Sequence, residues 1–276
     1  MSMRSTSNNL IIIILESLSS NRELILQLTR REITSRYTGS FFGLAWSIIN
    51  PLLLLLVYTF VFSVIFKTRW NLEGTTNHGN FALVLFIGMI LHTLIAEVLS
   101  QAPNKILQNI NYVKKVVFPL EILNVVSVLS ALIHAFISFT VLIIAVTIFN
   151  GMPPFSIILL PIIVFPFALL TLGISWILSS LGVFFRDLSQ IIGIFITALM
   201  FLAPIFYPIS ALPRGWQSYV YLNPLTFPIE QSRAIILFSK DIEWQSLFNY
   251  SAVSLVIFLF GFWWHLKTRD TFADVL

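Results

Sequence analysis

The stretch that decides the fold runs from Leu28 to Trp70: LTRREITSRYTGSFFGLAWSIINPLLLLLVYTFVFSVIFKTRW. It opens with a charged segment, and no charged residue then occurs between Phe41 and Phe66. About 20 apolar residues, each rising ~1.5 Å along a helix, match a hydrocarbon core ~30 Å thick. The stretch therefore predicts a membrane-spanning helix, and the basic residues before it place its N-terminal end in the cytoplasm.

The composition extends this interpretation to the whole chain. Of the 276 residues, 57% are hydrophobic and 10% are charged, whereas a soluble domain has roughly 25% charged residues. Several separate apolar runs indicate an all-α polytopic membrane protein. No basic patch outside the membrane flanks suits a nucleic acid. Because the chain has no cysteine, disulfides, thiolate metal sites and cysteine nucleophiles are excluded.

Six apolar spans are expected, with approximate bounds of 41–66, 81–100, 122–149, 155–185, 191–207 and 247–266. Of the sixteen Lys and Arg residues, eleven fall in segments assigned to the cytoplasm and five in those assigned to the outside. This bias agrees with the positive-inside rule, so we predict that both termini are cytoplasmic. Pro51, after Asn50, is expected to kink the first span because proline removes a backbone hydrogen bond.

Residues 21–276 are predicted to form one transmembrane domain, and residues 1–20 a variable tail. The run from Leu10 to Leu15 is short for a signal-peptide core, so an uncleaved surface-lying segment is the alternative. Ser20 and Glu23 have the spacing of a capping box, which predicts an interfacial helix over 21–38. Its basic residues contact phosphate headgroups or a partner, or they only fix orientation: Arg30, Arg31 and Arg36.

Residues 101–121 form an amphipathic segment between the second and third spans. Pro103 is expected to begin its helix and Pro119 to end it. One apolar stripe then faces either the membrane or a soluble partner, while the lysines are exposed. The stripe consists of Ile106, Ile110, Val113 and Val117, and the lysines are Lys105, Lys114 and Lys115.

Residues 209–246 combine aromatic residues with prolines outside the membrane. This pattern suits short helices that enter the membrane without crossing it, and an ordinary aromatic belt is the alternative. Aromatic side chains with a polar group are candidates for lining a pathway, and their flat faces suit sugar rings. These candidates are Trp46, Tyr58, Tyr207, Trp216, Tyr219 and Tyr221.

No motif for ATP hydrolysis, metalloprotease or serine-hydrolase chemistry occurs in the chain. Intramembrane ionisable residues are the default functional candidates, and here they are His92, Glu97 and His134. None has an evident charge partner in the sequence, so structural or pore-lining roles are favoured over a proton relay. The chain therefore lacks recognisable machinery for hydrolysing ATP or cutting a substrate, and we expect neither catalytic residues nor a metal site on it.

Three groups of motifs occur in order along the spans. The first comprises Arg36-Tyr-Thr-Gly-Ser, Gly43-Leu-Ala-Trp-Ser and Asn50-Pro-Leu-Leu; the second is Val113-Lys-Lys-Val-Val-Phe-Pro-Leu-Glu121; the third comprises Pro204-Ile-Phe-Tyr-Pro208, Leu222-Asn-Pro-Leu, Glu230 and Arg233. Together they resemble the membrane subunits of ABC-type polysaccharide exporters, the ABC-2 permeases that move O-antigen, capsular polysaccharide or teichoic acid. The resemblance extends from about Leu24 to Lys267.

The resemblance implies a homodimer in a bacterial inner membrane, with a channel between its copies and two ATP-binding cassette subunits beneath. ATP and Mg²⁺ would bind those partners, with no cofactor on this chain. Segment 104–119 would be the coupling helix, 24–36 the interface helix, and 209–240 the re-entrant gating helices. The matched motifs add Asn50, Asn223 and Arg233 to the channel or gate candidates.

The expected substrate is a lipid-linked polysaccharide such as O-antigen, whose export belongs to lipopolysaccharide biosynthesis. An exporter of teichoic acid, lipid or drug is the alternative within the same architecture. A membrane-embedded transferase would need paired carboxylates or a metal site near a membrane face, and no such pattern occurs. A secondary carrier would usually show internal repeats and more crossings, and the sequence shows neither.

Overall fold

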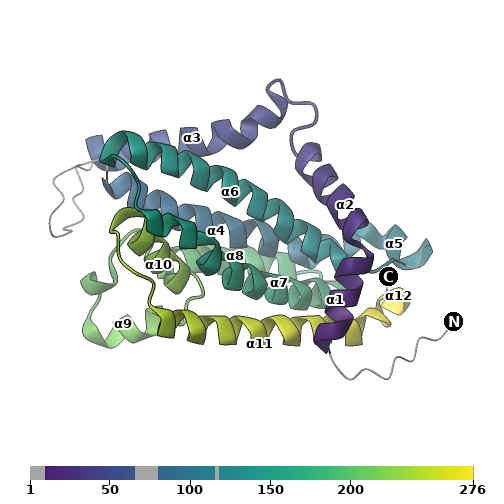
Figure 1. Cartoon of the computed structure of the whole chain (residues 1–276). Coiled ribbons are helices and arrows are strands. Elements are labelled where there is room, and N and C mark those ends of the chain that lie inside the picture. The colour runs from purple at the N-terminus through teal and green to yellow at the C-terminus, as the bar shows by residue number, and fades with distance from the viewer. Residues whose placement is uncertain (1–9, 66–79, 116–117, 276) are drawn as a thin grey trace.

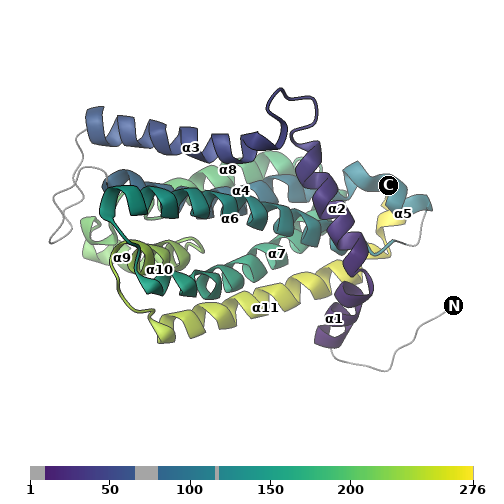
Figure 2. The same ribbon diagram turned by 45° about the horizontal axis from the view of Figure 1, so that its top comes forward.

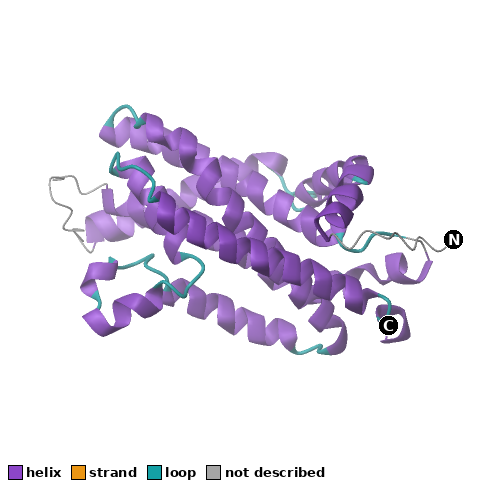
Figure 3. Ribbon diagram, turned by 60° about the horizontal axis from the view of Figure 1, so that its bottom comes forward, coloured by secondary structure: helices purple, strands orange, loops and turns teal. Residues whose placement is uncertain are grey.

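The structure is a computed structural model that describes residues 10–65, 80–115 and 118–275. Every regular element in these ranges is helical (Figure 3), which confirms the predicted all-α class. Helices α1, α5 and α12 lie at one end of an elongated bundle, and α9, α10 and the start of α11 lie at the other (Figure 1).

Five helical segments are long and apolar enough to cross a membrane. They are Gly43–Phe62, Phe81–Lys105, Ile122–Asn150, Phe155–Phe184 and Trp244–Arg269. In these segments lie α3 (Trp46–Tyr58), α4 (Asn80–Lys105), α6 (Ile122–Asn150), α7 (Leu160–Phe184) and α11 (Trp244–Arg269). The remaining expected span contains α8 (Leu188–Leu202), whose 15 residues rise only ~22 Å. A sixth crossing therefore stays a prediction.

Helix α4 is the central element of the bundle. In its most apolar window 78% of the residues are buried, against 11% for the first span. It packs against α6 and α7, while α3 lies at the edge beside α6 (Figure 2). Such a helix is hydrophobic all round because protein rather than water surrounds it.

Helices α7 and α11 form the closest helix pair, and two glycines make this approach possible. A Cβ atom on Gly173 would lie 2.6 Å from the carbonyl oxygen of Ile257, and one on Gly261 would lie 2.1 Å from that of Gly173. Small residues at helix contacts let backbones approach closely in membrane proteins.

The first span begins with a 3₁₀ turn at Gly43–Ala45 and ends in a π-helical turn at Thr59–Ile65. Helix α3 continues through Pro51. The helix does not end at the proline, and the expected kink there stays a prediction.

The N-terminal region differs from the predicted tail. Residues Leu10–Ser20 form helix α1, in which Ile14 is buried. The predicted capping box is wrong: Asn21 is the N-cap of α2 (Arg22–Ser35) and makes no side-chain capping bond. Its amide instead donates to the Ser17 carbonyl oxygen at 2.7 Å. Because the chain is already helical up to Ser20, that residue has no free cap position to occupy.

The segment after α4 also departs from its predicted helix. Helix α4 continues through Pro103 to Lys105, and the 3₁₀ turn Leu107–Asn109 and α5 (Ile110–Lys115) follow. Pro103 therefore does not begin the helix. Tertiary packing explains this, because Gly182 of α7 admits the Pro103 carbonyl, which would lie 2.0 Å from an added Cβ. Residues 116–117, and with them Val117, lie outside the described part.

Short helices occupy the region between the last two apolar helices, as predicted. They are the 3₁₀ turn Ile209–Ala211, α9 (Arg214–Val220) and α10 (Thr226–Leu237). A 3₁₀ turn at Phe155–Leu159 precedes α7, and α12 (Phe272–Val275) follows α11.

Candidate functional site

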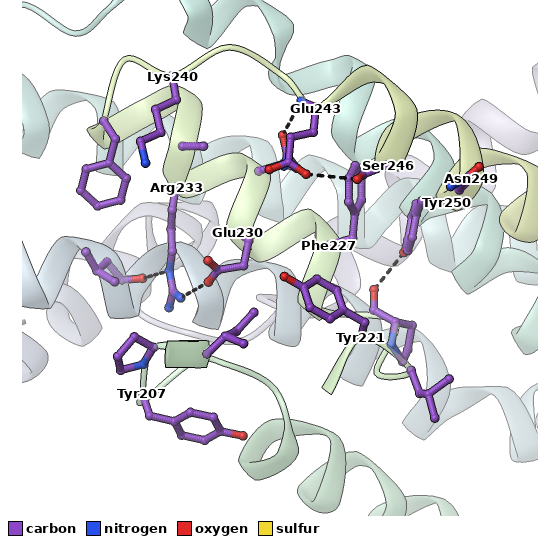
Figure 4. Close-up of a pocket in the computed structure, with 18 of the residues that line it drawn as sticks. Tyr207, Tyr221, Phe227, Glu230, Arg233, Lys240, Glu243, Ser246, Asn249 and Tyr250 are labelled. Atoms are coloured by element: carbon purple, nitrogen blue, oxygen red, sulfur yellow. Dashed lines mark hydrogen bonds and ion pairs between the residues drawn. The ribbon is translucent and has the colours of Figure 1, made fainter. Parts of the chain in front are cut away.

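A cleft of about 1660 Å³ lies between α10, the first half of α11 and the segments that follow α8 and α9 (Figure 4). Three of the predicted channel or gate residues line it: Tyr207, Tyr221 and Arg233. Its walls also carry the carboxylates of Glu230 and Glu243, which the sequence analysis did not single out as site residues. The cleft therefore combines aromatic surface with hydrogen-bonding groups.

Arg233 connects the segments that form one wall of this cleft through hydrogen bonds to their backbone. Its side chain is 2% exposed and donates to three backbone carbonyls on two other parts of the chain. Burial lowers the pKa of Arg233 to about 10, so the guanidinium is charged at pH 7. A buried charge needs such partners; they are the carbonyl oxygens of Val84 at 3.1 Å, Pro204 at 2.5 Å and Ile205 at 3.0 Å.

Pro204 and Ile205 lie two and three residues after the end of α8, so their carbonyls are outside its helical hydrogen bonds. Gly88 of α4 makes room there, since a Cβ on it would lie 3.2 Å from the Ile205 side chain. The guanidinium of Arg233 also forms an ion pair with the carboxylate of Glu230, at 3.0 Å. Arg233 thus fixes the segment after α8 against both α4 and α10.

Other polar groups set the shape of the cleft. The Gln231 side chain accepts from the Glu243 backbone amide at 3.2 Å, and Glu243 accepts from the Ser246 hydroxyl at 3.1 Å. The Tyr250 hydroxyl donates to the Pro224 carbonyl at 2.9 Å. These bonds tie α10 to the start of α11 and leave the Tyr221 ring 63% exposed.

The remaining gate candidates do not line this cleft. Asn223 joins the turn before α10 to the end of α8. Its side-chain amide donates to the Leu199 carbonyl at 3.0 Å, and its side-chain oxygen accepts from the Leu225 backbone amide at 3.0 Å. Trp216 and Tyr219 are exposed on α9. The others lie on the first apolar segment, away from the cleft: Trp46, Asn50 and Tyr58.

Two predicted coupling residues at the opposite end are buried. Lys105 was expected to be exposed but is 8% exposed, with its ammonium 2.9 Å from Glu32. Ile106 is fully buried against Leu123 and Phe272, so it is not available to a partner. Both side chains are covered by distant parts of the chain, Lys105 by α2 and Ile106 by the start of α6 and by α12. Ile110 is half-buried, and the side chains of Val113, Lys114 and Lys115 lie outside the described part.

The expectation that Glu97 and His134 lack partners is wrong. Arg36 forms an ion pair with Glu97, and its second terminal nitrogen lies 3.0 Å from His134 Nδ1. His134 Nδ1 lies 3.6 Å from Glu97, and the Tyr37 hydroxyl lies 3.5 Å from His134 Nε2. His92 is also paired, 3.2 Å from the Ile196 carbonyl. These partners are 61 to 104 residues apart, which hid them in the sequence.

Helix α2 is joined to α4 by two ion pairs of opposite direction. Glu32 of α2 contacts Lys105, and Arg36, one turn later, contacts Glu97. Each pair joins a different residue at the C-terminal end of α2 to a different residue of α4, so the two pairs together oppose sliding of α2 relative to α4. Arg30 and Arg31 remain exposed; Arg31 lines a smaller cleft of about 430 Å³ beside Lys105.

Comparison with known proteins places this arrangement in a family. The model for the ABC-2 type transporter matches residues 23–237. This chain belongs to the ABC-2 type transporter family. Membership implies association with ABC ATP-binding subunits, and the apolar helices make this permease a multi-pass membrane protein.

The relatives of this ABC-2 permease include polysaccharide exporters. It is 26% identical to the O-antigen export system permease protein RfbA of Myxococcus xanthus, over 92% of this chain and 95% of the relative. It is 27% identical to RfbA of Klebsiella pneumoniae, over 87% of both chains. The polysialic acid transport protein KpsM of Escherichia coli is 25% identical, over 83% of this chain and 87% of the relative.

Three carboxylates of the ABC-2 permease were missed as site residues by sequence reasoning: Glu32, Glu230 and Glu243. The spacing of Glu230 and Arg233, one helical turn apart, was the available signal for the second. Within the described residues, no group of three His, Asp or Glu side chains is placed to hold a metal ion.

Proposed function

We propose that this permease moves lipid-linked polysaccharide of the O-antigen type across the bacterial inner membrane. A second copy completes the channel, and two ATP-binding cassette subunits supply ATP hydrolysis with their own ATP and Mg²⁺. Both termini then lie in the cytoplasm. The observation that carries the proposal is the near full-length similarity to O-antigen export permeases from two genera.

Helix α4 supplies the mechanical link in this proposal. Its 26 residues span ~39 Å. Its C-terminal end leads directly into the coupling segment and carries Lys105, while Val84 near its start accepts a hydrogen bond from Arg233. A coupling segment displaced by ATP binding would move α4 as a rod and α2 with it. The outer cleft would respond through Arg233.

The lining of the outer cleft supports a glycan as the transported molecule. Tyrosine rings offer flat faces for sugar C–H groups, and carboxylate and amide oxygens accept hydrogen bonds from sugar hydroxyls. The relevant side chains are Tyr207, Tyr221, Glu230 and Asn249.

The test is a pull-down from native membranes in mild detergent, followed by an ATPase assay and by staining of surface polysaccharide after deletion of the gene. We expect a co-purified ATP-binding subunit, ATPase activity and loss of surface glycan. A homo-oligomer without ATPase activity would overturn the exporter. Intact surface glycan in a deletion strain, with the ATPase present, would leave the exporter and overturn the substrate.

A further inference from the structure

Helix α1 lies outside the family match, which begins at residue 23. It crosses the C-terminal end of α11 in both views of the bundle (Figures 1 and 2). Its Ser17 hydroxyl donates to Glu121 at 2.9 Å, and Glu121 lies 3.8 Å from Arg269 of α11. The helix is therefore fixed to the ends of α6 and α11 at a defined level.

The side chains of α1 divide into three arcs at 100° per residue. One arc packs on the protein and centres on Ile14, which is 4% exposed. The second arc is exposed and mainly apolar: Ile11, Leu15 and Ile12 are 50%, 60% and 41% exposed, and the small polar Ser19 lies between Leu15 and Ile12. The third arc is polar and exposed and contains Glu16 and Ser20. A helix with these arcs suits a position where protein, lipid and water meet.

The neighbouring end of α11 carries the markers of a membrane interface. Trp263 is 38% exposed, and the Lys267 ammonium lies 5.0 Å from the centre of its ring. Trp and basic residues concentrate at the headgroup level of membrane helices. Phe260, one turn earlier, is 48% exposed on the same apolar helix. Through Glu121 and Arg269, α1 is held at this level.

We propose that α1 is an in-plane membrane anchor whose apolar arc of Ile11, Ile12 and Leu15 inserts into the cytoplasmic leaflet. Glu16 and Ser20 then face the cytoplasm. The partner of this surface is a lipid bilayer. The exposed apolar side chains of α1 lie at the same depth as the end of α11, whose exposed face carries the Trp and Lys residues of a membrane interface. The exposed guanidinium side chains of α2, including Arg22 and Arg30, complement anionic headgroups on the adjoining surface.

The absence of cysteine allows a direct test of depth, because each variant needs only one substitution. The complex of full-length chain and ATP-binding subunit is labelled with a nitrobenzoxadiazole fluorophore at Leu15→Cys, Glu16→Cys or Phe260→Cys. It is reconstituted in phosphatidylethanolamine–phosphatidylglycerol vesicles with and without brominated phosphatidylcholine. All three sites are on exposed helix faces, so folding should survive labelling, which size-exclusion chromatography checks.

We expect quenching at Leu15→Cys to approach that at Phe260→Cys and to exceed that at Glu16→Cys at least twofold. A charged, membrane-impermeant thiol reagent should also modify Leu15→Cys at least tenfold more slowly than Glu16→Cys. Equal quenching and equal modification at positions 15 and 16 would overturn the anchor. Protection of Leu15→Cys without lipid quenching, lost when the ATP-binding subunit is removed, would assign the surface to that protein and also overturn it.

Discussion

The Arg233 Nε atom donates to the Val84 carbonyl oxygen across 3.1 Å, although 149 residues separate the two in the chain. This bond connects the short helix α10 with the first turns of the central helix α4. The same guanidinium holds the two carbonyls that follow α8. One buried guanidinium therefore joins α10, α4 and the segment after α8 in the wall of the outer cleft.

Substitution Arg233→Lys should destabilise the protein by about 3 kcal/mol, because a lysine ammonium cannot reach the same carbonyls in the planar geometry of arginine. The change is measured as thermal unfolding of the purified protein in detergent. Glu230→Gln is the control and should cost about 1 kcal/mol, since Glu230 is only partly buried. A wild-type unfolding temperature for Arg233→Lys would contradict the assigned role.

Reversal of the Glu32–Lys105 pair tests the register of α2 on α4. Glu32→Lys and Lys105→Glu should each lower ATPase stimulation in the complex, and the double variant should recover about 1–2 kcal/mol of coupling free energy. Glu23→Lys introduces the same charge at an exposed position of α2 and should have little effect. Additive losses in the double variant would show that the pair does not link the helices.

Gly173→Ala and Gly261→Ala should each destabilise the bundle by about 3 kcal/mol or more, because the added methyl group overlaps backbone of the facing helix. Gly193→Ala is the matched control. No atom lies within 4 Å of its added Cβ, so this change should be neutral or stabilising by up to about 1 kcal/mol. Unfolding in detergent is the measurement, and equal effects at all three glycines would refute the close contact.

Ile110→Asp should reduce recovery of the ATP-binding subunit in a pull-down at least fivefold, because a carboxylate replaces a half-buried apolar side chain in the coupling segment. Asn111→Asp introduces the same residue at the neighbouring exposed position and should leave recovery unchanged. Both variants must remain monodisperse in detergent. Full recovery and full export with Ile110→Asp would remove the coupling assignment.

Tyr221→Ala should lower glycan export several-fold if the outer cleft contacts the polysaccharide. Trp216→Ala removes an aromatic side chain of similar exposure, 66% against 63%, from outside the cleft. Surface glycan at equal protein abundance measures both. Equal losses would mean that the cleft has no special part in export.

The sequence could not predict the tertiary partners of its ionisable residues. Glu97 and His134 lie on different apolar helices, and Arg36 precedes the first span, so no local pattern connects them. Lys105 has the spacing of an exposed lysine on an amphipathic helix, yet it is the last residue of α4 and its ammonium pairs with Glu32 of α2. Periodicity records which residues share a face, but not which other segment covers that face.

The sequence by itself determined the all-helical membrane class, five of the apolar helices and the family, because long uncharged runs and ordered motifs are local properties. Tertiary structure alone decided that Pro103 stays inside α4, that Ile106 is buried, and that Arg233 joins α10 to α4. Each of these outcomes depends on backbone groups distant in the chain. Desolvation makes such groups costly unless packing brings their partners together.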